Sequence, residues 1–128
     1  MNRVQTKTGD LVYVNECKEN DVTFGFISVH LKHRYSSLNE AEKVLVEFMQ
    51  QLQPTFAVQY TTGPHFEPQP DASKIALVDY WQDVEKRDWK VKGWTNGAII
   101  AVFYVRNIGS VSVGRETFFL NSVEFAGL

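Results

Sequence analysis

The sequence contains a single cysteine, Cys17, among its 128 residues. One thiol cannot form a disulfide within the chain, so this is not a small secreted scaffold held together by disulfides. A chain of this length can bury a hydrophobic core without covalent cross-links. We therefore expect one domain that spans residues 1–128.

Long hydrophobic runs and an excess of charge of one sign are also missing. The longest apolar run, Ala98 to Val105, has the length of a strand, whereas roughly 20 residues are needed to cross a bilayer. Met1 to Asp10 is polar and contains no apolar segment of the signal-peptide kind. The formal charge is −2, with acidic and basic residues interleaved, which argues against non-specific nucleic-acid binding. These features predict a soluble, cytoplasmic protein with neither a membrane nor a nucleic acid as its partner.

Signatures of catalysis and of metal or nucleotide binding are absent from the sequence. The glycines are dispersed, so no phosphate-binding loop is predicted. His30 and His33 are three residues apart, but on a strand their side chains would point to opposite faces. Cys17 lies in no motif that would supply a neighbouring base. We therefore expect no cofactor, no metal site and no catalytic residue, and an enzymatic activity is less expected than a binding role.

The most distinctive pattern present is that of one long amphipathic helix, from about residue 38 to 53. Ser37 precedes Glu40 by three residues, the spacing of a capping box at the start of a helix. Pro54 is expected to end the helix, because the residue before a proline is disfavoured in helical geometry. The apolar residues recur at steps of three and four, which places them on one face: Leu38, Ala41, Val44, Leu45, Phe48, Met49 and Leu52.

Most of the remaining chain alternates as strands do. Val22 to Leu31 has apolar residues on both faces and is predicted to be a central strand, in which Gly25 marks a bulge or a close neighbour. Asn96-Gly97 predicts a hairpin with a type I′ turn. Further strands are predicted at residues 11–15, 56–61 and 98–105, with Phe56, Val58 and Tyr60 forming the core face of the second.

Three segments remain, and two of them leave alternatives open. Gly63 to Ser73 contains three prolines and is predicted to be an exposed loop. Lys74 to Val84 is predicted to be a strand, with a helix as the competing interpretation. Val111 to Phe125 fits a helix from about Arg115 to Ser122 better than a strand. The fold class is therefore α+β: a twisted antiparallel sheet of five to seven strands, covered by the helix at 38–53, with a C-terminal helix or strand closing the other face.

Two aspartates and a histidine are candidates for ligand binding. Asp79 and Asp83 would share one face of their strand with Trp81, and paired carboxylates can divide acid and base roles or hold a hard cation. A solvated sheet face, neutralised by nearby lysines and arginines, is the favoured alternative. His65 lies in the proline-rich loop, and loops on rigid scaffolds often carry function, although a solvated histidine is more common.

Three tryptophans cluster over a short span of the sequence. Tryptophan and tyrosine dominate binding hot spots because a large ring removes much surface from water while its polar edge finds a partner. Trp89 is predicted to lie in the core. Trp94 falls beside the predicted hairpin tip, where exposure is more common, and a partner surface or a small-molecule pocket there is as well supported as core filling. His65, Asp79, Trp81, Asp83 and Trp94 are thus the candidate residues for binding a ligand or a partner.

The order of elements and one short motif resemble a group of small sandwich domains. In the photosystem PsbP-like proteins and the Ran-binding Mog-like proteins, a terminal segment of the form Phe-Leu-x-Ser-Phe packs on the sheet after the last hairpin. The matching segment here is Phe119-Leu120-Asn121-Ser122-Val123, with valine in place of the usual aromatic residue. The resemblance covers about the last two thirds of the chain. It implies a binding, chaperone or accessory role and identifies no functional residue.

These observations lead to two functional hypotheses. The first is a non-catalytic protein-binding or adaptor module, with an unidentified protein partner or a second copy in a homodimer. The alternative is a small-molecule-binding or hydrolytic domain with a pocket between helix and sheet that uses His65, Asp79 and Asp83. A concave pocket with converging polar groups would favour the alternative, and a flat exposed patch around Trp94 would favour the binding module.

Overall fold

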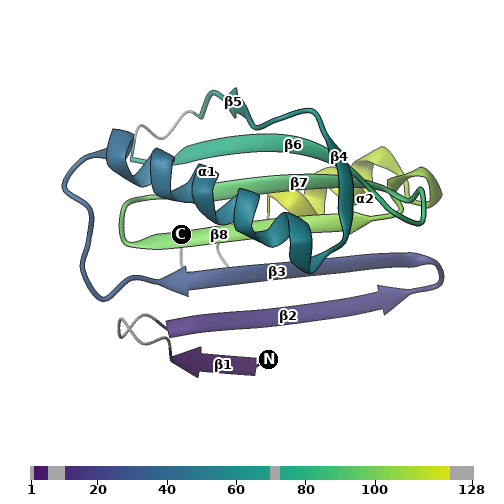
Figure 1. Ribbon diagram of the computed structural model, residues 1–128, viewed down its shortest axis with the longest axis horizontal. Coiled ribbons are helices and arrows are strands. Elements are labelled where there is room, and N and C mark those ends of the chain that lie inside the picture. The colour runs from purple at the N-terminus through teal and green to yellow at the C-terminus, as the bar shows by residue number, and fades with distance from the viewer. Residues whose placement is uncertain (1, 6–10, 70–72, 122–128) are drawn as a thin grey trace.

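Eight antiparallel strands form a single sheet in the computed structural model, which describes residues 2–5, 11–69 and 73–121 (Figure 1). Seven of the strands lie side by side in the order β1-β2-β3-β8-β7-β6-β4, and β5 also pairs with β6. One long helix covers one face of the sheet and a short C-terminal helix covers the other, so the α+β fold class is confirmed. The strands are β1 (Asn2–Gln5), β2 (Leu11–Glu19), β3 (Val22–His30), β4 (Val58–Thr61), β5 (His65–Glu67), β6 (Ile75–Asp83), β7 (Asp88–Thr95) and β8 (Ile99–Arg106).

The long helix α1 (Leu38–Thr55) begins as predicted. The Ser37 side chain accepts a hydrogen bond from the Glu40 amide at 3.2 Å. The prediction that Pro54 ends the helix is wrong, because Pro54 lies inside the last turn and the helix continues to Thr55. A proline so close to the end removes one backbone donor but leaves the remaining turn intact. The Phe56 amide still bonds to the Leu52 carbonyl at 3.1 Å.

Helix α1 packs closely on the middle of the sheet, where it crosses β7. The side chains of Leu45 and Met49 are fully buried. A Cβ atom at Gly93 would lie 2.7 Å from the Met49 sulfur and 2.9 Å from Leu45 Cδ1. The missing side chain at Gly93 therefore lets the helix approach β7, and the layer between helix and sheet is filled at this point.

The opposite face of the sheet is covered by the short 3₁₀ helix η1 (Ile108–Ser110) and by helix α2 (Val113–Leu120). The Phe119 ring contacts the rings of Phe24 and Phe103, at centroid distances of 5.3 and 5.7 Å. The predicted C-terminal helix is confirmed over its described part, while residues 122–125 lie outside the described residues. The apolar residues buried on this face are Val22, Phe24, Phe26, Ala76, Trp94, Ala101, Phe103, Val105 and Leu120.

Several predicted strands are confirmed, with changes at their ends. The central strand β3 and the strand at β6 form as predicted, whereas β2 continues past residue 15 to Glu19. The type I′ turn is wrong, because Gly97 has a φ of +92° while Asn96 has no positive φ. The Asn96 side chain instead accepts hydrogen bonds from the amides of Ala98 and Ile99, both at 2.9 Å. The Asn96 side chain thus provides the acceptor for two backbone amides of the turn.

The edge of β6 is shared by two short strands, as the top of Figure 1 shows. β4 pairs with Trp81–Asp83, and β5 pairs with residues 76–78. The predicted loop over residues 63–73 is therefore wrong at His65–Glu67, while residues 70–72 lie outside the described residues. Pro64 and Pro68 flank the three-residue strand instead of interrupting it, and edge strands tolerate proline in this way.

Candidate functional site

Asp79 and Asp83 each hold the indole of one tryptophan inside the α1 face of the sheet. The Trp81 indole N–H donates to Asp79 Oδ2 at 2.8 Å, and the Trp89 indole N–H donates to Asp83 Oδ2 at 2.9 Å. Trp81 and Trp89 are directly opposite each other on β6 and β7, with ring centroids 5.9 Å apart. Trp89 lies in the core, as predicted. Both carboxylates thus orient aromatic side chains in the core.

Asp83 also organises the turn between β6 and β7. Its side chain accepts from the amides of Glu85 and Arg87, both at 3.0 Å, and from Arg87 Nε at 2.8 Å. Burial by itself would raise the pKa of the Asp83 carboxyl. The hydrogen bonds from Trp89 and Arg87, together with the charge of Arg87, outweigh burial and lower this pKa below its ordinary value.

Asp79 is 0% exposed, and four residues donate to its carboxylate. Besides Trp81, these donors are the hydroxyls of Thr61 and Thr62, at 2.8 and 3.1 Å, and the Tyr80 amide at 2.8 Å. Among the described residues no lysine, arginine or histidine forms an ion pair with Asp79. The network fixes the strand end at Thr61 and Thr62 against β6.

The favoured interpretation of the two aspartates as part of a solvated face is wrong, because both are buried. Of the cations expected to neutralise them, Arg87 does pair with Asp83, whereas alternation along β7 directs Lys90 and Lys92 to the opposite face of the sheet. There, Lys90 Nζ lies 3.0 Å from Glu116 Oε1 of α2, and Lys92 Nζ lies 2.5 Å from Glu67 Oε1 of β5.

Trp94 is only 4% exposed, so the expected exposure of this indole is wrong. It lies on the face that α2 covers, and its indole N–H donates to the Leu120 carbonyl at 3.1 Å. Lys92 Nζ lies 4.5 Å from the centre of one of the Trp94 rings. Trp94 therefore docks the C-terminal helix and presents no flat aromatic patch to solvent.

His65 is exposed on β5 and is not brought together with the two aspartates. It pairs with Val78, which neighbours Asp79 along β6 and therefore points to the other face. Of the five candidate residues, the structure brings together Asp79, Trp81 and Asp83, and it places His65 and Trp94 elsewhere. The described residues contain no group of three His, Cys, Asp or Glu side chains arranged to hold a metal ion.

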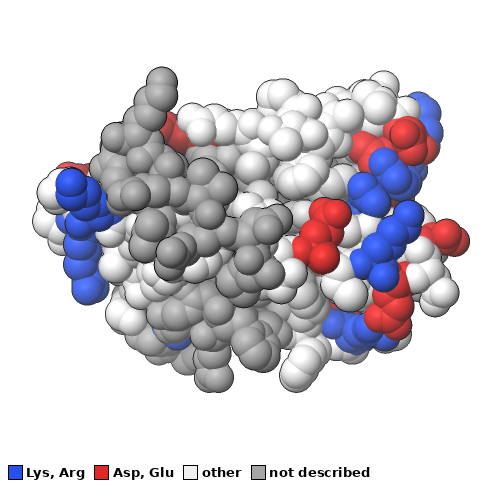
Figure 2. Space-filling view, turned by 90° about the horizontal axis from the view of Figure 1, so that it is seen from below, with Lys and Arg blue, Asp and Glu red and all other residues white. Residues whose placement is uncertain are grey.

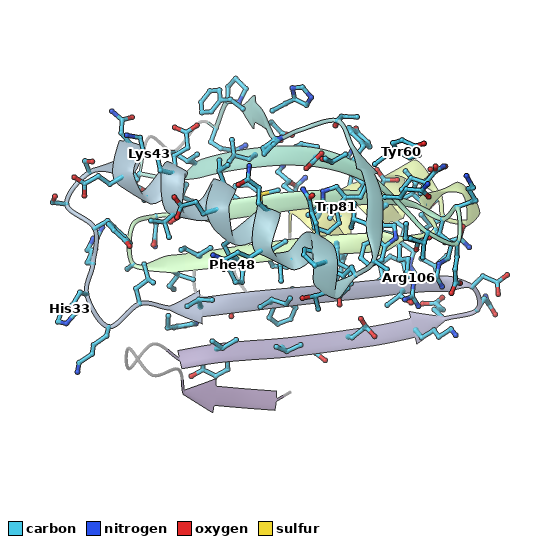
Figure 3. The ribbon with its side chains drawn as sticks, in the orientation of Figure 1. His33, Lys43, Phe48, Tyr60, Trp81 and Arg106 are labelled. Atoms are coloured by element: carbon cyan, nitrogen blue, oxygen red, sulfur yellow. The ribbon has the colours of Figure 1, made fainter. Side chains whose placement is uncertain are left out.

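An open hollow of about 300 Å³ lies at the β4 edge of the sheet, beside the buried Asp79 network. Two tyrosines at its rim are exposed, Tyr60 by 61% and Tyr80 by 42%. Its lining residues are Tyr60, Thr61, Thr62, Tyr80, Trp81, Gln82 and Asp88. Four of these, Thr61, Thr62, Tyr80 and Trp81, donate hydrogen bonds to Asp79, so the Asp79 carboxylate holds the wall of the hollow in place. Figure 3 labels Tyr60 and Trp81 on their neighbouring strands.

Tyr60 was missed as a site residue because the alternation of its strand predicts a core position. The pairing of β4 with β6 shifts register between Val58 and Tyr60. Val58 therefore pairs with Asp83, on the α1 face, whereas Tyr60 pairs with Gln82, on the other face. The extra residue of this bulge turns the Tyr60 ring out of the core.

A second hollow, of about 260 Å³, lies between the β2–β3 turn and the start of α2. The guanidinium of Arg115 in this hollow is paired with the carboxylate of Glu19. Figure 2 shows acidic and basic side chains interleaved at this end of the molecule, on the right. Because Arg115, the one basic residue that lines this hollow, is already paired with Glu19, the hollow at the β4 edge is the stronger candidate for a binding site.

No described helix is both long enough and apolar enough to cross a bilayer. Comparison with known proteins identified no matching family model, no matching curated protein and no matching solved structure.

Proposed function

We propose that this chain is a non-catalytic protein-binding or accessory module that binds its partner through the edge formed by β4, β5 and β6. The carrying observation is the number of exposed apolar side chains along that edge: Tyr60 and Tyr80 project on the α2 side of the sheet, and Phe66, which pairs with Leu77, projects on the α1 side. Of the five large hydrophobic residues that are exposed in the described part of the chain, all but Phe118 lie at this edge. We call these four residues the edge surface: Tyr60, Phe66, Tyr80 and Val84.

Tyrosine and phenylalanine supply large contact areas at low entropic cost and are enriched at the centres of protein interfaces. An exposed apolar patch on a soluble domain commonly marks such an interface. The bulge between Val58 and Tyr60 supports the same interpretation, because bulges often re-aim a side chain at a functional edge. The edge surface therefore supports protein binding.

The hydrolytic alternative receives less support from the arrangement of its residues. It requires His65, Asp79 and Asp83 to converge between helix and sheet. His65 lies on the other face, and the two carboxylates are occupied by donors that hold Trp81 and Trp89. Close packing of Met49 on Gly93 also fills the layer where that pocket would begin.

A relationship to the PsbP-like and Mog-like sandwich domains is part of this proposal. It is supported by the position of Phe119 and Leu120, which pack on the sheet after the last hairpin as the resemblance implies. A cytoplasmic location belongs to the same proposal and is supported by the free, exposed thiol of Cys17. A second copy of the chain is the alternative partner for the edge surface.

The test is to compare three tagged proteins as baits in extracts of the source cells: the wild type, Y60A/Y80A and F118A. Phe118 is the control because it is an exposed aromatic residue that belongs to α2 and not to the strands of the edge surface. We expect the wild type and F118A to retain the same partner in stoichiometric amount, and Y60A/Y80A to lose it. Equal recovery by all three baits would contradict the proposal. Light scattering of the purified protein separates a homodimer through this edge from a different partner.

A further inference from the structure

We propose that the hollow at the β4 edge binds the guanidinium group of an arginine side chain that a protein partner presents. This inference rests on the proposed binding function and names the chemistry that the edge surface recognises. It follows from the charge around the hollow, from the two tyrosine rings at its rim, and from the Oδ2 atom of Asp88, to which no described residue donates.

The hollow is acidic. Of its seven lining residues, Asp88 is the one that carries a charge, and the Asp79 carboxylate lies directly behind the lining. The nearest cations have acidic partners of their own. Lys90 is paired with Glu116, and Arg87 is paired with Asp83 and Glu85. A cationic group is therefore the ligand that complements this hollow, and an anionic group is disfavoured.

The two tyrosines provide faces on which a planar cation can stack. Tyr60 pairs with Gln82, two residues along the strand from Tyr80, so both rings project from the same face of the sheet. Lys90 Nζ lies 5.7 Å from the centre of the Tyr80 ring, so one face of this ring already has a cation beside it, and an incoming cation is expected to stack on the Tyr60 ring or on the other face of Tyr80. Cation–π attraction of this kind is strongest for a cation that is easily desolvated, and guanidinium is more weakly hydrated than ammonium.

Asp88 offers the acceptor that a guanidinium requires. Its Oδ1 accepts from Gln82 Nε2 at 3.2 Å, and no described residue donates to its Oδ2. Asp88 is exposed at the rim, so an incoming group can reach it. Guanidinium presents several N–H donors in one plane and can stack on a ring while donating to a carboxylate, a combination that a lysine ammonium cannot reproduce.

The open shape of the hollow favours a side chain delivered by a protein over a free small molecule. Drug-sized ligands are usually enclosed on most of their surface, whereas this hollow is shallow and continues into the exposed edge surface. Arginine is also among the residues most enriched at interface hot spots. The partner is thus expected to place an arginine near the centre of its contact with the edge surface.

The test is an NMR titration of the full chain with three probes: N-acetyl-arginine amide, N-acetyl-citrulline amide and N-acetyl-lysine amide. Citrulline has nearly the shape of arginine without its charge. We expect arginine amide, binding in roughly the millimolar range, to shift the amide signals of residues 60–62, 80–82 and 88. Citrulline amide should leave these signals unchanged, and lysine amide should bind more weakly than arginine amide.

The matched variants are D88N at the hollow and E47Q on the exposed side of α1, which remove the same charge at different places. D88N should weaken binding of arginine amide by about fivefold, and E47Q should leave it unchanged. Equal shifts with arginine and citrulline amides, equal binding of lysine amide, or no shift at these residues would overturn the arginine site. The bait experiment remains independent: a partner lost from Y60A/Y80A would support the binding function even if this titration failed.

Discussion

The Tyr104 hydroxyl donates a hydrogen bond of 2.5 Å to the Glu16 carboxylate, across the intervening strand β3. Gly25 lies between them in the register of the sheet, opposite Glu16 on one side and Tyr104 on the other. The tyrosine ring occupies the space that a side chain at Gly25 would need. Burial, together with the hydrogen bond to Glu16, raises the pKa of Tyr104 above its ordinary value.

Gly25→Ala should therefore destabilise the protein. A Cβ atom there would lie 2.3 Å from Tyr104 Cζ, so the buried ring must move and its bond to Glu16 must lengthen or break. We expect a loss of about 1–3 kcal/mol in the free energy of unfolding, measured by urea denaturation. Gly114→Ala is the control, because a Cβ atom at Gly114 would have no neighbour within 4 Å in the described part of the chain. Equal stability of the two variants would show that Tyr104 does not depend on Gly25.

Asp79→Asn should also destabilise the protein, although it preserves the shape of the side chain. The amide has one acceptor oxygen in place of two, and its NH₂ group would face donors such as the Thr61 hydroxyl and the Trp81 indole. Leaving a buried donor unsatisfied costs about 1–3 kcal/mol, which denaturation followed by tryptophan fluorescence would measure. The exposed Asp88→Asn should change stability by less than about 0.5 kcal/mol. A similar result for both variants would argue against a structural role of the Asp79 network.

Asp83 should make the stability of the protein depend on pH in the acidic range. Its pKa is lowered in the folded state relative to the ordinary value of 3.8. Its contribution is therefore fully present above pH 3.8 and is lost as the pH falls through the lower, folded-state pKa. We expect the stability difference between wild type and Asp83→Asn to be constant near neutrality and to shrink below pH 3.8. Thermal unfolding at a series of pH values would test this, and a difference that grows on acidification would contradict it.

The pair formed by Lys90 and Glu116 should hold α2 against the sheet. Both side chains are largely buried, and their charged atoms lie 3.0 Å apart. Lys90→Met keeps much of the side-chain volume but leaves the Glu116 carboxylate without its partner, so we expect faster hydrogen exchange at the backbone amides of α2. Lys43→Met, on the exposed side of α1, is the control. Unchanged exchange in α2 would show that its apolar contacts suffice for docking.

Local patterns in the sequence were enough to predict several elements of the fold. The spacing of apolar residues from Leu38 to Leu52 predicts α1, and alternation predicts β3 and β6, because backbone geometry sets these periods independently of what packs against them. The end of α1 was less predictable. Pro54 restricts the backbone locally, but its position in the last turn lets the helix continue.

The candidate site could be predicted only in part. The pattern of β6 correctly places Asp79, Trp81 and Asp83 on one face, but their burial and bonding depend on strands that are distant in sequence. Thr61 reaches Asp79 from β4, and Arg87 reaches Asp83 around a turn. A local pattern contains no information about such donors.

The sequence by itself determined the long helix α1 and the central strand β3, since the period of a side-chain pattern follows from the backbone conformation. Only the tertiary structure decided which faces stay exposed. Trp94 is buried because α2 folds back over its face, and Tyr60 is exposed because one extra residue in β4 shifts its register against β6. A one-residue shift in pairing turns the side chains of a strand to the opposite face of the sheet without altering the local sequence. The edge surface and its hollow therefore exist only in the folded chain.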